Sequence, residues 1–104
     1  SNLVVGIIDL SEKLLMECGF EIDEAGDALA PIVWGNIKHI LNNGVVEALT
    51  GPIERGDADT IKKHLAAISG NDKETYIAVS RQVLEVAKRK NKDRDYSKIE
   101  EILK

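Results

Sequence analysis

The 104-residue sequence is poor in the residues that form disulfides and aromatic cores, and it has no long apolar run. Cys18 is the only cysteine, so no disulfide can form within the chain, and a reducing, cytoplasmic compartment is expected. We expect Cys18 to be a buried, inert thiol. Aromatic residues make up only 4%, so the core must be aliphatic, which suits packed helices. No apolar run approaches the ~20 residues that span a bilayer, and no signal peptide is visible, so no membrane partner is expected.

An excess of basic residues is also missing. The chain has 14 Lys and Arg against 18 Asp and Glu, for a formal net charge of −4. Nucleic-acid-binding modules normally present a basic surface, so nucleic acid is not an expected partner. Positive charge gathers only at Lys88-Arg89-Lys90-Asn91-Lys92. We interpret this cluster as a solvated helix C-terminus, where the helix dipole favours cations, with a phosphate- or nucleic-acid-binding patch as the alternative.

Apolar residues recur at helical spacing along most of the chain, and no segment has the alternation of a strand. The pattern predicts an all-α fold, a bundle of about five to six helices forming a single helical domain over residues 1–104. The expected helices cover Asn2 to Cys18, Asp23 to Leu41 (ended by Asn42-Asn43-Gly44), Val45 to Leu49, Ala58 to Ile68, a segment capped by Asn71 and Glu74 that reaches Lys90, and a last helix capped by Ser97.

The second expected helix is apolar on more than one side. A helix of this kind is central in a fold or is buried between partners. Pro31 should kink it, because the proline ring removes a hydrogen bond and crowds the preceding turn. Trp34 is interpreted as a core or interface residue, with a ligand platform as the alternative. On the fifth helix, the expected buried stripe is Tyr76, Val79, Val83 and Ala87.

The most specific stretch is the polar loop, Leu49-Thr50-Gly51-Pro52-Ile53-Glu54-Arg55-Gly56-Asp57. Four of its residues are expected to shape it: Gly51, Pro52, Gly56 and Asp57. Glycine permits backbone angles that other residues avoid, proline fixes its own φ, and aspartate before a helix is a common N-cap. A polar loop with a specified conformation is often functional, although a plain connector between helices would carry the same signals.

The sequence shows no other motif for metal binding, catalysis or cofactor binding. His39 and His64 do not stand at metal-ligand spacings, so no metal site is expected. The acidic pairs show no sign of the burial that general acid–base catalysis needs, and no catalytic residue is identified. The sequence contains no glycine-rich phosphate-binding motif, so this chain alone is expected to bind no cofactor.

The string Ala48-Leu49-Thr50-Gly51-Pro52-Ile53-Glu54-Arg55-Gly56-Asp57, followed by Thr60, His64 and Leu65, resembles a family of bacterial predicted oxidoreductases. In that family a Rossmann-like dinucleotide-binding domain precedes a helical domain of unknown function. The helical domain is similar to the C-terminal domains of 6-phosphogluconate dehydrogenase-like and pyrroline-5-carboxylate reductase-like enzymes. The resemblance spans nearly the whole chain. It implies a fragment that lacks its N-terminal Rossmann domain, with Ser1-Asn2 as native sequence rather than a cloning scar.

This resemblance implies the substrate-side and dimerisation domain of an NAD(P)-dependent oxidoreductase, inactive without its Rossmann half. The parent would bind NAD or NADP, and the expected partners are a second copy of the chain, the missing Rossmann domain and an unidentified small-molecule substrate. Asn2, Thr50 and Arg55 would bind that substrate, with Arg55 holding a carboxylate in bidentate fashion. The alternative is a free-standing helical interaction module without a catalytic role, in which the second helix and Trp34 bind a partner helix.

Overall fold

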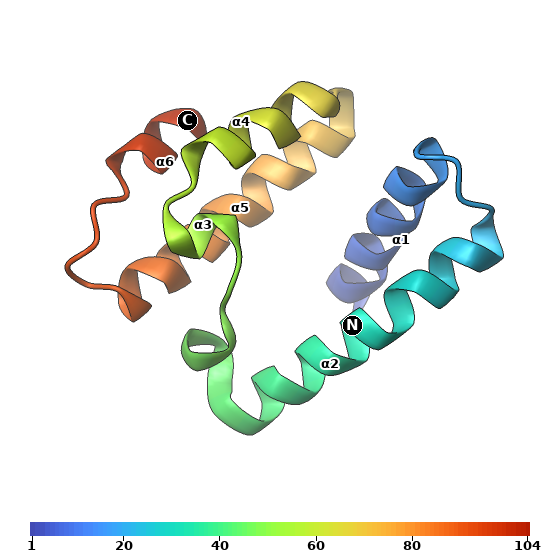
Figure 1. The fold of residues 1–104 in the computed structure, drawn as a ribbon, viewed down its shortest axis with the longest axis horizontal. Helices are drawn as coiled ribbons and strands as arrows, with labels where there is room; N and C mark the ends of the chain where they lie inside the picture. The colour runs from blue at the N-terminus through green and yellow to red at the C-terminus, as the bar shows by residue number, and fades with distance from the viewer. The chain divides into compact units, whose positions relative to one another are not determined.

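A computed structural model describes all of residues 1–104 and contains six α-helices and no strand, which confirms the predicted all-α class (Figure 1). The helices are α1 (Asn2–Glu17), α2 (Ile22–Ala48), α3 (Pro52–Arg55), α4 (Ala58–Ala67), α5 (Gly70–Lys90) and α6 (Ser97–Ile102). The chain divides into two compact units, Ser1–His39 and Ile40–Lys104. One domain over residues 1–104 stays a prediction.

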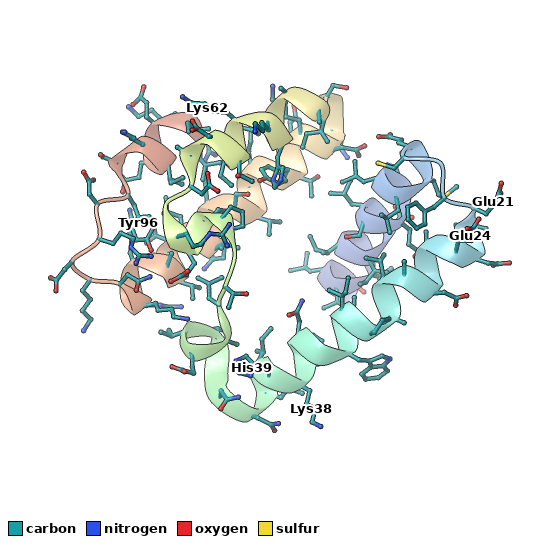
Figure 2. The ribbon with its side chains drawn as sticks, viewed as in Figure 1. Glu21, Glu24, Lys38, His39, Lys62 and Tyr96 are labelled. Carbon is teal, nitrogen blue, oxygen red and sulfur yellow. The ribbon has the colours of Figure 1, made fainter.

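The first unit consists of α1 and the first part of α2, joined by a turn. Gly19 follows the end of α1 with φ = 100°, a conformation that glycine adopts without strain. α2 begins at Ile22, one residue before the predicted start. The Glu24 carboxylate accepts a hydrogen bond from the Glu21 N–H at 3.2 Å, which satisfies one of the free backbone donors at this helix start (Figure 2).

Most of the large apolar side chains in the first unit are exposed. Ala25 is its one fully buried residue. Ten of the thirteen exposed large hydrophobic residues of the chain lie here, with Leu3 85% and Trp34 74% exposed. Trp34 is therefore not a core residue. Cys18 is also exposed, so the prediction of a buried thiol is wrong, because this residue lies in the turn after α1 rather than on a packed face.

The helical path of α2 is broken at Gly44 rather than at Pro31. Gly44 has φ = 85° and ψ = 164°, outside the helical region, so residues 45–48 form a separate turn of helix. The sequence predicts both the end of the long helix at this glycine and a short helix after it. At Pro31 the backbone keeps helical angles. The helix therefore continues through Pro31, because proline loses a hydrogen bond but its φ remains compatible with a helix. The kink expected at Pro31 stays a prediction.

The second unit has a core to which α3, α4, α5 and α6 all contribute. Its buried apolar residues are Ile53, Ile61, Leu84, Ala87, Tyr96, Ile99 and Leu103. α5 turns Ser80, Leu84 and Ala87 inward, whereas Val79, part of the predicted stripe, is 41% exposed. Ala87 of the predicted stripe is buried, and Tyr76 and Val83 pack against the core, so the predicted face is correct except at Val79. Periodicity locates an apolar stripe but does not say which edge of it the neighbouring helices cover.

Two helix starts differ from their predicted caps. α5 begins at Gly70 after Ser69, so Asn71 lies inside the helix instead of capping it. Ser97 is the first residue of α6 rather than its cap, and the Asp95 carboxylate accepts the Ser97 N–H at 2.9 Å. Several polar residues stand near each of these starts, and local sequence does not decide which one serves as the cap.

Candidate functional site

The polar loop is built around the single helical turn of α3. Pro52 is the first residue of this turn, where its missing N–H has no cost, and it follows Gly51 at φ = 112°. Gly56 ends the turn at φ = 73°, in the left-handed region. The Gly56 N–H donates to the Ile53 carbonyl at 3.0 Å and the Asp57 N–H donates to the Pro52 carbonyl at 2.8 Å. These two bonds form a Schellman motif, which fixes the backbone conformation of the loop at the end of α3.

Asp57 begins the next helix directly after that motif. Its carboxylate accepts the Thr60 N–H at 3.1 Å and the Thr60 hydroxyl at 2.7 Å. The hydroxyl bond, the N–H bond and the charge of Arg55 together lower the pKa of Asp57 below its ordinary value of 3.8. The predicted N-cap of α4 is confirmed, and this carboxylate is engaged within the chain.

Arg55 is the last residue of α3, and its side chain is 58% exposed. Its guanidinium Nη2 lies 3.7 Å from Asp57 Oδ2, an exposed ion pair that carries little energy. Thr50 is exposed at the start of the same loop. Asn2, also exposed, is the first residue of α1 and belongs to the first unit. The substrate-binding roles of these three residues stay predictions.

The connection between α5 and α6 holds the polar loop through Glu54. The Tyr96 hydroxyl donates to the Glu54 carbonyl at 2.6 Å (Figure 2). The Arg94 guanidinium donates to the same carbonyl at 2.7 Å. The Asn91 amide donates to the Glu54 carboxylate at 2.9 Å and to the Tyr96 hydroxyl at 3.0 Å. Sequence reasoning missed this network, because Glu54 and Tyr96 are 42 positions apart and such contacts leave no local signal.

The basic cluster at the end of α5 also takes part in tertiary contacts. The Lys90 ammonium donates to the Leu49 carbonyl at 2.6 Å and to the Glu47 carbonyl at 3.3 Å. Lys88 forms an ion pair with Glu100 of α6. The interpretation as a merely solvated helix end is therefore incomplete. These lysines tie α5 to the start of the polar loop and to α6.

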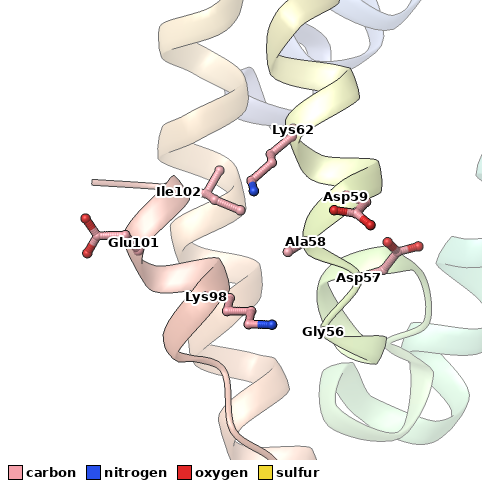
Figure 3. Close-up of a pocket in the computed structure, with 8 residues that line it drawn as sticks. All are labelled: Gly56, Asp57, Ala58, Asp59, Lys62, Lys98, Glu101 and Ile102. Atoms are coloured by element: carbon pink, nitrogen blue, oxygen red, sulfur yellow. The ribbon is translucent and has the colours of Figure 1, made fainter.

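A pocket of about 540 Å³ opens between α4 and α6, within the second unit (Figure 3). Gly56 and Asp57 of the polar loop form part of its lining, and Ala58 and Ile102 supply apolar surface. Its other lining residues are charged: Asp59, Lys62, Lys98 and Glu101. The volume falls in the range of small-molecule sites. Thr50 and Arg55 do not line it. The sequence predicts Gly56 and Asp57 only as residues that shape the loop, so it does not predict this pocket.

Neither histidine belongs to a metal site in the structure. No group of three or more His, Cys, Asp or Glu side chains is placed to hold a metal ion. His64 Nδ1 lies 2.9 Å from the Tyr76 hydroxyl, and the two rings meet edge to face with centroids 5.8 Å apart. This pair ties α4 to α5.

None of the six helices combines the length and apolarity that crossing a bilayer requires.

Comparison with known families gives a match over residues 1–83 to the family described as "Domain of unknown function (DUF2520)". The match includes the polar loop and α4 and ends inside α5, before the α5–α6 connection. No curated protein and no solved structure matches the chain. The expectation of a helical domain of unknown function is confirmed, whereas the link to Rossmann-like oxidoreductases stays a prediction. By this match over most of its length, the chain belongs to the family of the domain of unknown function DUF2520.

Proposed function

We propose that this chain is the substrate-side and dimerisation domain of an NAD(P)-dependent oxidoreductase, whose dinucleotide-binding half lies elsewhere in the complete protein. The observation that carries the proposal is the construction of the polar loop. A Schellman motif, an N-cap and the hydrogen bonds to Glu54 hold its backbone, while Arg55 remains exposed. A rigid turn that presents an arginine is suited to bind a substrate carboxylate.

In this proposal the two halves of the enzyme have separate roles: one binds the cofactor and the other binds the substrate. In hydride transfer the nicotinamide cofactor supplies the redox chemistry, and the protein orients the substrate and excludes water. Arg55 would exchange its weak contact with Asp57 for a bidentate pair with the substrate carboxylate. Thr50, in the same loop, would orient another polar group of the substrate.

The exposed apolar residues of the first unit support the dimerisation part of the proposal. Leu3, Val5 and Trp34 are each at least 69% exposed. Monomeric domains rarely leave large contiguous apolar patches uncovered, and a second copy of the chain would cover such residues through a two-fold interface.

The same exposed residues also favour a second candidate, a free-standing helical interaction module that binds a partner helix. The two candidates differ in the sequence that precedes residue 1 in the gene. A strand followed by Gly-x-Gly-x-x-Gly supports the oxidoreductase, whereas an unrelated domain supports the interaction module.

Calorimetry with NAD and NADP tests the proposal on the complete gene product and on this chain. We expect the complete protein to bind one of the two dinucleotides and this chain to bind neither. A dissociation constant below ~100 μM for this chain, which is a binding free energy near −5.5 kcal/mol, would contradict the placement of the cofactor site in the other half of the enzyme. A complete protein that binds neither dinucleotide would contradict the oxidoreductase and favour the interaction module.

A further inference from the structure

We infer that the pocket between α4 and α6 binds a small organic anion on the ammonium groups of Lys62 and Lys98. Lys62 comes from the second turn of α4 and Lys98 from the first turn of α6, and both side chains point into the gap between the two helices (Figure 3). The inference uses neither Arg55 nor a dinucleotide, so it is independent of the oxidoreductase proposal.

Neither lysine forms a close ion pair within the chain, although Lys98 lies near enough to Asp95 to help lower the pKa of that carboxyl. The ion pairs of the second unit involve other cations, namely Arg55, Lys88, Arg94 and Lys104. The nearest acidic neighbour of Lys98 along the chain, Glu100, is paired with Lys88. Asp95, one position further, accepts the Ser97 N–H. Two like charges directed into one pocket repel each other, and an anion bound between them would remove that repulsion.

The carboxylates of the same pocket do not cancel this charge. Asp57 is bound to Thr60 and paired with Arg55. Glu101 is paired with Lys104 at 2.8 Å and points away from the gap between the helices (Figure 3). Asp59 is the one lining carboxylate that no cation of the chain neutralises. The charge that remains for a ligand is therefore positive.

The size and lining of the pocket narrow the class of ligand. A volume of about 540 Å³ exceeds the needs of a single inorganic ion and suits a metabolite-sized molecule. Ala58 and Ile102 offer an apolar surface beside the two ammonium groups. A small molecule with a carboxylate or a phosphate group and a short apolar part satisfies both features.

The test is an NMR titration of the ¹⁵N-labelled full chain with succinate and, separately, with inorganic phosphate. We expect saturable shifts in α4 and α6. Lys62→Gln and Lys98→Gln should each weaken binding about two- to fivefold, since each removes an exposed ion pair. Lys63→Gln, the exposed neighbour on α4 outside the pocket lining, should leave affinity unchanged. Asp59→Asn should tighten binding by a similar factor, because it removes a repulsive charge.

Tighter binding of succinate would assign the site to carboxylates, and tighter binding of phosphate would assign it to phosphorylated compounds. The exposed positions of the lysines mean that all variants should fold, which unchanged melting temperatures would verify. No saturable shift below about 10 mM of either probe would overturn the inference. An equal loss of affinity in Lys63→Gln would overturn it as well, because binding would then follow net charge rather than the pocket.

Discussion

At the scale of single residues, Arg55 and Asp57 are close neighbours in the polar loop but are expected to serve different purposes. In the complete protein, Arg55→Ala should lower kcat/KM by about 10- to 150-fold, because a charge-assisted pair with the substrate contributes roughly 1.5–3 kcal/mol. The melting temperature should hardly change, since the 3.7 Å contact with Asp57 is exposed. Steady-state kinetics and thermal melts measure both effects.

Arg89→Ala provides the matched control, because Arg89 is an exposed arginine of α5 outside the polar loop. It should alter neither kinetics nor stability. If Arg55→Ala instead melts several degrees lower while its folded fraction turns over substrate normally, Arg55 is a structural residue and the polar loop is a connector.

Asp57 is expected to stabilise α4 in a pH-dependent way. Its pKa is lowered in the folded chain by the hydrogen bonds from Thr60 and then by Arg55, so folding favours the ionised carboxylate. The stabilisation is present above the ordinary pKa of 3.8 and is lost as the pH falls through the lower, folded value. Asp57→Asn keeps an acceptor for Thr60 but removes the charge. The difference in melting temperature between wild type and this variant should therefore be constant near neutral pH and shrink in acid.

Thermal melts between about pH 7 and pH 3 check this dependence, with Asp93→Asn as an exposed control in the turn after α5. A difference that widens on acidification would be inconsistent with a lowered pKa. Asp57→Ala, which removes the cap altogether, should lower the melting temperature at every pH and leave activity intact.

At the scale of elements, the rigidity of the polar loop depends on the connection between α5 and α6. Tyr96 is only 4% exposed, and its hydroxyl both donates to Glu54 and accepts from Asn91. Tyr96→Phe keeps the packed ring and removes these bonds. We expect the free energy of unfolding to fall by about 0.5–1.5 kcal/mol, measured by urea denaturation.

Tyr76→Phe is the corresponding control on α5. The Tyr76 hydroxyl bonds to an exposed histidine, His64, so water can replace that contact. Its loss should cost less than the loss of the Tyr96 hydroxyl. A larger effect at Tyr76 would show that the contacts to Glu54 do not hold the polar loop.

At the scale of the whole molecule, we expect a two-fold-symmetric homodimer. The reason is the exposed apolar surface of the first unit, where Leu3 and Trp34 are 85% and 74% exposed. Sedimentation at concentrations well above micromolar should give twice the 11.4 kDa mass of the chain. Trp34→Asp should shift the mass toward the monomer without loss of helicity.

Val79→Asp tests whether any exposed apolar residue would have the same effect. Val79 is 41% exposed on α5, in the second unit, and its replacement should leave the dimer intact. A wild-type chain that remains monomeric at these concentrations would refute the dimer and leave the exposed residues of the first unit to a different partner.

The sequence by itself determined the features that depend on neighbouring residues. The all-α class follows from apolar periodicity, the end of the long helix from Gly44, and the cap of α4 from Asp57 followed by Thr60. Each of these involves backbone angles or hydrogen bonds within a few positions of the chain. Such preferences are present before any packing occurs, so local sequence reports them.

Tertiary structure alone decided which surfaces meet. Three features involve distant segments: the bonds from Tyr96 and Arg94 to Glu54, the inward face of α5 at Leu84, and the pocket lined by both Lys62 and Lys98. These contacts depend on how α3, α4, α5 and α6 share one core, and a helical stripe is wide enough to allow several such arrangements. Side-chain packing selects among them, and the pocket between α4 and α6 is a product of that selection.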